Sequence, residues 1–494
     1  MNDMYKERII SIFLMLLVCL LAVASGTRHM TLDEAIMLAR LRSVDASVAL
    51  NELRTSYWQY RTYRADMLPE ISFQGTLPNY TKNYSAYQLE DGSYTFIRNN
   101  YLGLNGRLSI DQNIPFTGGR LSIETSLDYL RMLDGGKAQR FMSVPVALTL
   151  DQPIFGVNTL KWDRKIEPVR YREAQAKFLQ STEEVAMAAI NSFFNLLMAK
   201  TSVAVAQQNF DNAVKLYEVA QAKREMGQIS KNDLLQLELN RLEAKSALTD
   251  AQSAYKERMF ALRAFLDMEG DVEIDPVLPS MVDVPEMIYG DVLDKAMANN
   301  AFSRNLRRRQ IEADYQVAKA KGDMRQITLY AQVGYTGTDK GFSGSYSRLK
   351  DNQVVEVGVK IPILDWGKRR GAVKVAESNR EVVATRLRKE TMDFRQDLFI
   401  LVERFNNQRQ QVEIAVAADG IAARRYDANV QTFMLGKIST LDLNDSQVKK
   451  DEARSEYISQ LFRYWYYYYQ LRSLTLWDFE HGTNIDADFN ALIK

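Results

Sequence analysis

The chain contains very little cysteine and histidine. One cysteine, Cys19, and two histidines, His29 and His481, occur in 494 residues. Two histidines exclude an imidazole-rich metal site, and a single cysteine excludes a disulfide framework within the chain. The sequence also lacks phosphate-binding and dinucleotide-binding glycine motifs, and it has too little histidine and cysteine for a catalytic triad. We therefore expect no enzyme, no metal site and no cofactor.

The chain also lacks an excess of either charge. Its 63 Lys and Arg residues are balanced by 62 Asp and Glu residues, which leaves a formal net charge of +1. This balance gives no electrostatic reason to expect nucleic acid as a partner. Apolar residues make up 46% of the chain and charged residues 25%, proportions that indicate a folded protein and exclude disorder.

The N-terminus has the pattern of a secretion signal. Two basic residues precede an apolar run from Ile9 to Ala24, which ends in small residues suited to cleavage. The run is shorter than the roughly 20 residues that a membrane anchor needs. We predict that residues 1–24 are a signal peptide, so the mature chain loses Cys19 and has no thiol. No later segment resembles a transmembrane helix, so a mature chain that spans a membrane must do so with strands.

Six segments alternate apolar and polar residues with a period of two, as expected of strands with two unlike faces. They cover residues 71–77, 102–111, 121–129, 144–151, 327–336 and 355–361. The pattern fits a barrel with lipid outside and water inside, although a soluble antiparallel sheet has the same pattern. Long polar loops at 79–100 and 337–352, and aromatic residues near the strand ends, favour the membrane. Four or six strands cannot close a water-filled barrel, so several copies must share one.

Two long stretches are typical of helices. Pro168 to Met226 has no internal proline or glycine, and Ala372 to Leu435 has one glycine; each is about 60 residues, or roughly 90 Å as helix. Apolar residues follow a heptad spacing from Val203 to Ala220, which indicates coiled-coil packing. A second such stripe runs from Leu234 to Tyr255.

A glycine ends each long stretch, and a serine follows it. Gly227 and Gly436 suit the left-handed conformation that terminates a helix, while Ser230 and Ser439 are candidate N-caps for a second helix. We therefore predict two helical hairpins, each with its tip at one of these glycines.

The strands and hairpins recur at one fixed offset. Pro153 and Pro362 end corresponding strands, and 362 − 153 = 209. The tip glycines Gly227 and Gly436 have the same separation, since 436 − 227 = 209. Because two landmarks share one offset, the region between them was copied without net insertion, as in proteins built from repeated supersecondary units around an axis.

The β regions of the two copies differ in length. Asp66 and Pro153 are 87 residues apart, whereas Asp323 and Pro362 are 39 apart. The excess carries an alternating hairpin around residues 115–119. We predict that this hairpin either adds strands to the barrel or packs beside it.

The ordered set of motifs resembles the TolC-type outer-membrane efflux channels, the outer membrane factor family. It comprises Thr31–Ala35 and its partner Leu293–Ala296, the Leu68-Pro69 step into the first strand, the strand end Gln152–Phe155, and the tip Leu435–Asp445. The likeness spans nearly the whole mature chain. No single motif is diagnostic, but their order, repeated twice, is specific.

The resemblance implies an α+β membrane protein. Three copies would form an outer-membrane β-barrel of four to six strands per chain, continued by a long periplasmic helical barrel, in a Gram-negative bacterium. The helical tunnel and equatorial region would comprise residues 31–67, 156–326 and 365–478, and the barrel segments residues 71–155 and 327–364. Residues 479–494 would form a C-terminal tail.

The resemblance also implies a function and partners. The chain would be the exit duct of a tripartite efflux or type I secretion system. It would act as a homotrimer in outer-membrane lipid, with a periplasmic adaptor and an inner-membrane pump as partners and no chemistry of its own. The alternative is a periplasmic coiled-coil adaptor or structural protein, which also has a long helical hairpin but needs only one hairpin and compact β domains.

By position against the family's tip motif, Asp442 and Asp445 would line the channel entrance. Three copies would then place two rings of carboxylates there, which attract cations. The alternative is that a carboxylate at this point only stabilises a helix start. Asp233 is the counterpart of Asp442 in the first copy, since 442 − 209 = 233.

The tips themselves would contact the adaptor. The residues implied in this contact are Gly227, Ile229 and Ser230 of the first copy and Gly436, Ile438 and Ser439 of the second. The best-known family members close the entrance with an arginine and a tyrosine, but this chain has Ile438 and Phe433 at those positions. We therefore expect the closed state to be held by other residues.

Overall fold

The computed structural model describes residues 28–493 except 135–137, 228, 270–271, 325, 361–363, 435–436 and 439. The predicted signal peptide and Cys19 lie outside the described residues. The chain divides into two compact units. Unit 1 comprises the residues up to Leu53, Ala176–Asn300 and the residues from Phe394 onward, and unit 2 comprises Arg54–Gln175 and Ala301–Asp393.

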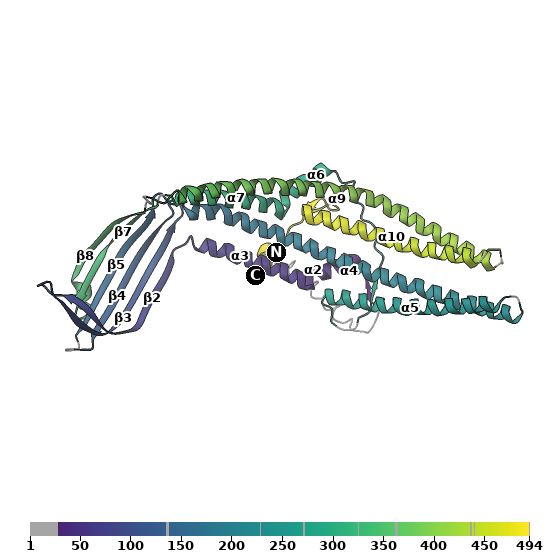
Figure 1. Cartoon of the computed structure of the whole chain (residues 1–494), viewed down its shortest axis with the longest axis horizontal. Coiled ribbons are helices and arrows are strands. Elements are labelled where there is room, and N and C mark those ends of the chain that lie inside the picture. Colours follow the sequence, from purple (N-terminus) through teal and green to yellow (C-terminus); the bar gives the residue numbers. More distant parts are fainter. Residues whose placement is uncertain are drawn as a thin grey trace, which may run out of the picture. The chain divides into compact units, whose positions relative to one another are not determined.

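Helices dominate the chain, and strands are concentrated in two segments (Figure 1). The helices are α2 (Leu32–Arg42), α3 (Val44–Ala65), α4 (Thr159–Glu225), α5 (Lys231–Phe265), α6 (Tyr289–Asn299), α7 (Ala301–Gly322), α8 (Phe342–Ser347), α9 (Lys368–Met434), α10 (Thr440–Thr475) and α11 (Phe489–Ile493). The long strands are β2 (Glu70–Gln88), β3 (Tyr94–Ile114), β4 (Gly119–Met132), β5 (Gln139–Pro153), β7 (Gln326–Asp339) and β8 (Leu349–Lys360). The short strands are β1 (Arg28–Met30), β6 (Ile274–Pro276), β9 (Trp477–Asp478) and β10 (Thr483–Asn484).

The repeat predicted from the sequence is present in the helices. Helices α4 and α9 each have 67 residues, and their first residues are 368 − 159 = 209 apart. Helices α5 and α10 begin at 231 and 440, again 209 apart. Upstream of the strands the offset is larger. Helices α2 and α6 both have 11 residues and begin 289 − 32 = 257 apart, and the 22-residue helices α3 and α7 begin 301 − 44 = 257 apart. The first copy therefore contains 257 − 209 = 48 extra residues between α3 and α4.

Unit 2 contains an antiparallel sheet of six strands among the described residues, in the order β2-β3-β4-β5-β7-β8. Each of the six alternating segments found in the sequence lies in one of these strands, the last one as far as Lys360, since Ile361 and the predicted strand end Pro362 lie outside the described residues. The prediction of six strands is confirmed. The extra residues of the first copy supply the β3–β4 hairpin, which lies within the sheet between β2 and β5. Of the two alternatives left open, the hairpin therefore adds strands to the sheet.

The two expected loops are only partly loops. Strands β2 and β3 continue through the predicted loop 79–100 as a paired ribbon, from Asn79↔Gly103 to Gln88↔Tyr94. This ribbon is exposed, so polar and aromatic residues suit both of its faces and no alternation marks it as strand. The predicted loop 337–352 contains the end of β7, the short helix α8 and the start of β8. Both loop predictions were wrong over most of their length, because the polar composition of these segments was taken to mean that they contain no helix or strand.

Helix α4 begins earlier than predicted and includes Pro168. A proline inside a helix removes one backbone hydrogen bond, but the 67-residue helix continues through it. Among the described residues, α4 also carries one stretch that by length and composition alone is apolar enough to cross a membrane. The sequence predicts no such helix in the mature chain. Phe193, Phe194 and Leu196 of α4 are buried in the core of unit 1, so this packing accounts for part of the apolar character.

The core of unit 1 is built from helices of both copies. Buried apolar side chains of α4 pack with those of α9 and α10, and α2, α5 and α6 add to the same cluster. The aromatic run of α10 contributes Tyr464 and Tyr468, each 1% exposed. The Tyr464 hydroxyl donates to the carbonyl of Val282 at 2.7 Å. Burial raises the pKa of Tyr464 to about 12, so this phenol stays protonated at neutral pH. The aromatic run is thus part of the core.

A buried carboxylate joins three helices of unit 1. Glu183 on α4 is 1% exposed and accepts hydrogen bonds from Arg40 on α2 at 2.5 Å and from Arg472 on α10 at 3.1 Å. Arg472 also pairs with Asp478 at 2.8 Å. Loss of both arginines would leave the buried Glu183 charge uncompensated, which is strongly destabilising. This group therefore fixes the arrangement of α2, α4 and α10.

Ion pairs also join the helical segments of unit 2. Arg308 on α7 pairs with Glu173 on α4 at 2.7 Å and with Glu312 on its own helix at 2.9 Å. Arg309, also on α7, pairs with Glu390 on α9 at 2.6 Å. These charged contacts link α4, α7 and α9 where apolar packing is sparse.

Candidate functional site

The first hairpin tip has the predicted geometry at its turn. Gly227 follows α4 with a φ of +72°, a left-handed conformation that glycine adopts without strain. Ser230 is the N-cap of α5, and its hydroxyl accepts from the backbone N–H of Asp233 at 3.1 Å. The carbonyl of Ile229 accepts from Arg224 at 3.0 Å. A glycine turn and a serine cap therefore end one helix and start the next.

Asp233 completes a capping box with Ser230. Its carboxylate accepts from the Ser230 backbone N–H at 3.1 Å and from the Ser230 hydroxyl at 2.7 Å. The side-chain hydrogen bond from Ser230 is the main cause that lowers the pKa of the Asp233 carboxyl, and the side chain is exposed. Asp233 is therefore charged at neutral pH and held in one orientation by its own helix start.

The second tip is described in part. Gly436 and Ser439 lie outside the described residues, and Ile438 is half-buried. Asp442 lies exposed in the first turn of α10, and Asp445 follows one turn later. Asp445 pairs with Arg425 of α9 at 2.9 Å, with both side chains about half exposed. Pairs this exposed contribute little stability, about 0–1 kcal/mol, so Asp445 remains accessible to solvent ions.

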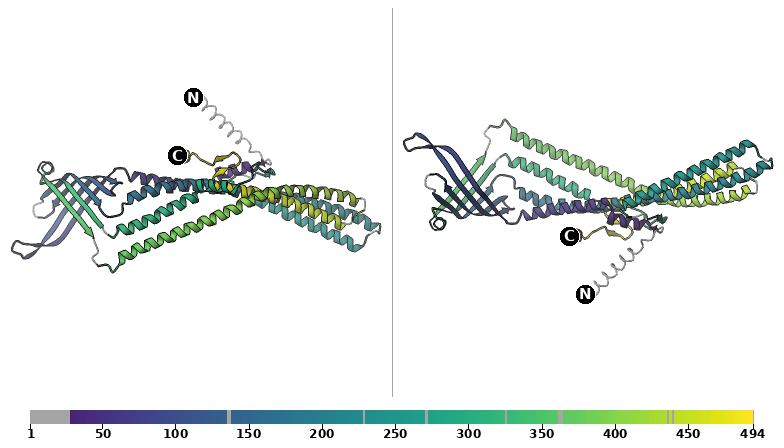
Figure 2. Two further views of the ribbon diagram at one scale, coloured as in Figure 1. Left: turned by 90° about the horizontal axis from the view of Figure 1, so that it is seen from above. Right: turned by 90° about the horizontal axis from the view of Figure 1, so that it is seen from below.

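The described residues include a polar group between the two hairpins that sequence reasoning missed. It joins α4 of the first hairpin to α9 and α10 of the second, which run alongside each other in Figure 2. We call it the hairpin clamp, and it consists of Asn209, Asn212, Tyr426, Gln447 and Asp451.

The hairpin clamp is held by side-chain hydrogen bonds. Asn212 donates to the Tyr426 hydroxyl at 2.8 Å, and Asn209 donates to Asp451 at 3.4 Å while accepting from Gln447. Burial raises the pKa of both the Asp451 carboxyl and the Tyr426 hydroxyl. No local pattern marks these residues, since Asn209 and Asp451 are 451 − 209 = 242 positions apart. Asn209 and Asn212 lie in the heptad stretch 203–220 but not at its apolar positions, so the sequence carries no signal that pairs them with α9 or α10.

Lys450 adds a charge to the hairpin clamp. Its ammonium group lies 4.3 Å from the centre of the Tyr426 ring and donates to Gln208 of α4 at 2.8 Å. It also lies 3.6 Å from the Asp451 carboxylate, which offsets part of the cost of burying that charge. The second hairpin is therefore attached to the first by directional polar contacts as well as by apolar packing.

The sheet of unit 2 has one apolar and one polar face. Register places Phe73, Leu108 and Ile123 on the apolar face, with exposed fractions of 71%, 43% and 44%. The opposite face carries ion pairs between neighbouring strands, Arg107 with Glu124 at 3.6 Å and Arg120 with Asp111 at 3.3 Å. One face thus suits an apolar medium and the other suits water.

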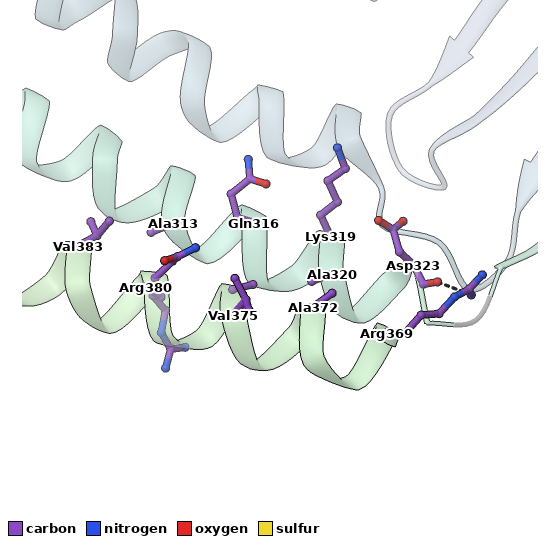
Figure 3. A pocket seen from close by; sticks show the side chains of 12 residues that line it. Ala313, Gln316, Lys319, Ala320, Asp323, Arg369, Ala372, Val375, Arg380 and Val383 are labelled. Atoms are coloured by element: carbon purple, nitrogen blue, oxygen red, sulfur yellow. Dashed lines mark hydrogen bonds between the residues drawn. The ribbon is translucent and has the colours of Figure 1, made fainter. Parts of the chain in front are cut away.

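A groove of about 550 Å³ lies between α7 and α9 in unit 2 (Figure 3). At one end Arg369 reaches the C-terminus of α7, where it donates to the carbonyl of Asp323 at 2.7 Å. Arg369 therefore stabilises a helix end. Alanine and valine residues of both helices line the groove together with six polar or charged residues, among them Lys319, Asp323 and Arg380.

One group among the described residues has metal-ligand chemistry. Asp478, Glu480 and His481 place ligand atoms within 4.8 Å of one another. Asp478 is already engaged, since it pairs with Arg472 at 2.8 Å and its carboxylate accepts from two backbone N–H groups. Glu480 and His481 are exposed. These contacts make the group a turn that closes the end of α10.

Sequence comparison identifies a family. The model of the family described as outer membrane efflux protein matches residues 35–267 and 294–464. No curated protein sequence matches the chain significantly.

Comparison of folds finds solved structures of similar architecture. The Campylobacter jejuni CmeC outer membrane channel is 13% identical, with a TM-score of 0.66 over 94% of this chain and 88% of that one. The outer membrane protein VceC of Vibrio cholerae is 13% identical, with a TM-score of 0.62 over 92% and 97% of the two chains. The open state of the Neisseria gonorrhoeae MtrE outer membrane channel is 14% identical, with a TM-score of 0.60 over 92% and 91%. At this identity the likeness concerns the fold.

Proposed function

The chain belongs to the outer membrane efflux protein family, and from that premise we propose that three copies form the exit channel of a tripartite efflux or type I secretion system. The channel lies in the outer membrane and extends into the periplasm. It receives substrates from an inner-membrane pump through a periplasmic adaptor, and it performs no chemistry of its own. The duct accounts for the predicted signal peptide, the two-faced sheet and the two helical hairpins together.

The two-faced sheet is the observation that carries this proposal. Its apolar face exposes large side chains such as Ile71 at 70% and Val355 at 73%. A contiguous exposed apolar surface marks a membrane or partner contact. Within the described residues neither β2 nor β8 has a second neighbour. Unpaired strand edges are costly in lipid, so further copies of the chain must complete the barrel.

We propose that Asp442, Asp445 and Asp233 line the periplasmic entrance. All three are exposed at the hairpin tips, and Asp233 is charged and fixed in orientation by its capping box. In three copies, rings of such carboxylates favour the passage of cations. The capping role of Asp233 is compatible with this, since the hydrogen bonds leave its charge in place.

The entrance is tested by ion selectivity in planar bilayers. The double replacement Asp442→Asn and Asp445→Asn is expected to reduce the preference of the channel for cations over anions. The control Glu452→Gln changes another exposed carboxylate farther along α10, one that pairs with Lys449 at 2.9 Å. Equal selectivity of the double variant and the unchanged channel would contradict the assignment.

We propose that the tips also contact the adaptor, through Gly227, Ile229 and Ser230 and their second-copy counterparts Gly436, Ile438 and Ser439. Ile229 and Ile438 are the apolar side chains of the two turns, and both are half-buried. A partner hairpin of complementary shape would cover them. Ile229→Asp combined with Ile438→Asp is expected to abolish cross-linking to the adaptor without affecting the trimer. Retained cross-linking would remove these residues from the contact.

The architecture is tested by extraction and native mass. We expect the protein to require detergent and to run as a trimer by native mass spectrometry and single-particle imaging. The alternative function, a periplasmic coiled-coil adaptor or structural protein, predicts that the mature chain dissolves without detergent. A soluble monomer would therefore contradict the channel.

A further inference from the structure

We propose that each chain contributes all six strands to the barrel, so that three copies close a barrel of eighteen strands with a wide, water-filled lumen. The inference rests on the proposed trimeric channel and deepens it. The extra β3–β4 hairpin of the first copy is then part of the barrel wall. A chain built like the second copy alone, with one β-hairpin in each copy, would give a barrel of twelve strands.

Backbone pairing on both sides holds the hairpin in the wall. Strand β3 pairs with β2 from Glu70↔Asp111 to Gln88↔Tyr94. Strand β4 pairs with β5 from Arg120↔Asp151 to Arg131↔Gln139. A hairpin displaced from the sheet would lose both ladders. Inside a membrane each freed backbone group would lack a partner, at a large cost in free energy.

Side chains on the polar face link the hairpin to strands of both copies. Glu124 on β4 pairs with Arg107 on β3 at 3.6 Å and accepts from Gln332 on β7 at 3.3 Å. The Gln332 contact reaches across β5, so it joins the inserted hairpin to the second copy. On the other side the Ser72 and Ser109 hydroxyls lie 2.9 Å apart across β2 and β3. The hairpin therefore shares one continuous polar surface with its neighbours.

The two faces of the hairpin have the same polarity as the faces of the neighbouring strands. Ile110 and Ile123 of the hairpin are 38% and 44% exposed, and Leu148 and Val333 of the next strands are 45% and 53% exposed on the same face. A hairpin packed on the lipid side would bring the Arg107–Glu124 pair into lipid. A hairpin folded into the lumen would expose its apolar face to water. Membership of the wall satisfies both faces at once.

The sheet edges allow closure without a break in the antiparallel order. With six strands of alternating direction, β2 and β8 run in opposite directions, so β8 of one copy pairs antiparallel with β2 of the next. Three copies then give eighteen strands. With strands about 4.8 Å apart and tilted by about 40°, such a barrel is about 36 Å across between backbones, against about 24 Å for twelve strands. Barrels of sixteen to eighteen strands enclose an aqueous channel.

Strand counting in the purified trimer tests the proposal. We would determine the structure of the full mature protein in lipid nanodiscs by single-particle cryo-EM. Eighteen strands are the expected result. A trimer with twelve strands in the wall and the β3–β4 hairpin outside it would overturn the inference while leaving the proposed function intact. Particles that are not trimeric barrels would contradict the proposed function itself, and the inference with it.

Disulfide trapping provides a second test that does not depend on a map. Cys19 is the only cysteine of the chain and lies in the predicted signal peptide, so introduced thiols have no background. Ser72→Cys with Ser109→Cys should form an intrachain disulfide in the assembled protein. Ser72→Cys with Thr149→Cys should not, because β3 and β4 lie between these positions. A Ser72–Thr149 disulfide in the trimer would show β2 beside β5 and would overturn the inference. Each single-cysteine variant controls for assembly.

Discussion

The two copies of the repeat agree in their helices and differ in their strands. The long helices α4 and α9 have 67 residues each, and the short helices that precede the strands match in length as well. The first copy nevertheless has four strands in the sheet and the second has two. A helix that packs against its counterpart cannot change length without shifting every contact beyond the change. A β-hairpin can be added to a sheet because it returns the chain to the same end.

The helical core shows how matched positions can carry unlike side chains. Three pairs of buried residues lie 209 positions apart on α4 and α9. They are Ala189 with Leu398, Phe193 with Val402, and Leu196 with Phe405. In each pair one side chain is the larger, and all six belong to one apolar cluster. The repeat thus keeps the same positions buried in both copies. The side-chain volume that fills the core is divided unequally between the two members of each pair.

Removal of the extra hairpin would make the two copies alike, and it should have the largest effect. Deletion of residues 89–138 joins β2 to β5 and leaves four strands per chain. We expect a trimer whose barrel narrows from about 36 to about 24 Å between backbones, visible in cryo-EM projections. A variant that no longer assembles would show that the hairpin is needed for more than width. An unchanged barrel outline would contradict its place in the wall.

Truncation of one matched core pair tests whether the copies share the core equally. Phe193→Ala should lower the free energy of unfolding by about 3–5 kcal/mol, because it empties a large fully buried site. Val402→Ala removes two carbons and should cost about 2 kcal/mol. Thermal unfolding in detergent, followed by circular dichroism, measures both. If the two variants lost the same free energy of unfolding, the core would have collapsed into the cavity left by Phe193, and the expectation would be wrong.

A charge on the apolar face tests whether inserted and repeated strands meet the same medium. Ile123→Arg on β4 and Val333→Arg on β7 should each cost about 2–4 kcal/mol if the site lies near the bilayer midplane. The control Gln332→Lys lies on the polar face beside Glu124, so it should cost less than about 1 kcal/mol. The yield of heat-resistant trimer in outer-membrane fractions reports the effect. Tolerance of Ile123→Arg alone would place the hairpin outside lipid.

We expect the attachment of the second hairpin to depend on pH through Asp451 of the hairpin clamp. Burial raises the pKa of the Asp451 carboxyl in the folded protein. Its contribution to stability is therefore full below the unfolded pKa of about 3.9 and is lost as pH rises through the folded pKa. Asp451→Asn should remove this dependence and raise the melting temperature at pH 7 relative to the unchanged protein. Melting curves at pH 4 and pH 7 provide the measurement. A lower melting temperature of Asp451→Asn at pH 7 would show that the pairing with Lys450 outweighs the burial.

The helix caps should give the smallest effect. Ser230→Ala removes the side chain that caps α5 and should cost about 1 kcal/mol. Its counterpart Ser439 is predicted from the sequence as the cap of α10, so Ser439→Ala should cost the same. Hydrogen exchange of the first turns of α5 and α10 resolves such local changes. Faster exchange in one variant only would show that the two tips are capped differently.

Much of the fold could be predicted from the sequence because the periodicity of apolar residues is a local property. Alternation with period two located the six long strands, and the two stretches with heptad spacing lie in the helices α4 and α5. Prediction from the sequence failed where the two faces of a strand do not differ in polarity. The ribbon between Asn79 and Asn100 is exposed and shows no alternation, so it was mistaken for a loop.

The candidate site was only partly predictable. The glycine and serine of the first tip follow from backbone conformation and capping, and Gly227 and Ser230 have these roles in the structure. The capping box of Asp233 follows the same local logic. The hairpin clamp does not, because Asn209 and Asp451 meet only after two helices of different copies pack together.

The sequence by itself determined the repeat, the helix and strand types, and the family likeness, since each of these depends on neighbours within one element or on a fixed offset. Only the tertiary structure decided that β3 and β4 enter the sheet between β2 and β5, and that the second hairpin is joined to the first by partly buried polar groups. Strand order and buried polar pairing join residues that are far apart in the chain. Their energies come from backbone groups and charges that must find partners once water is excluded, and no local pattern records which partner each will find.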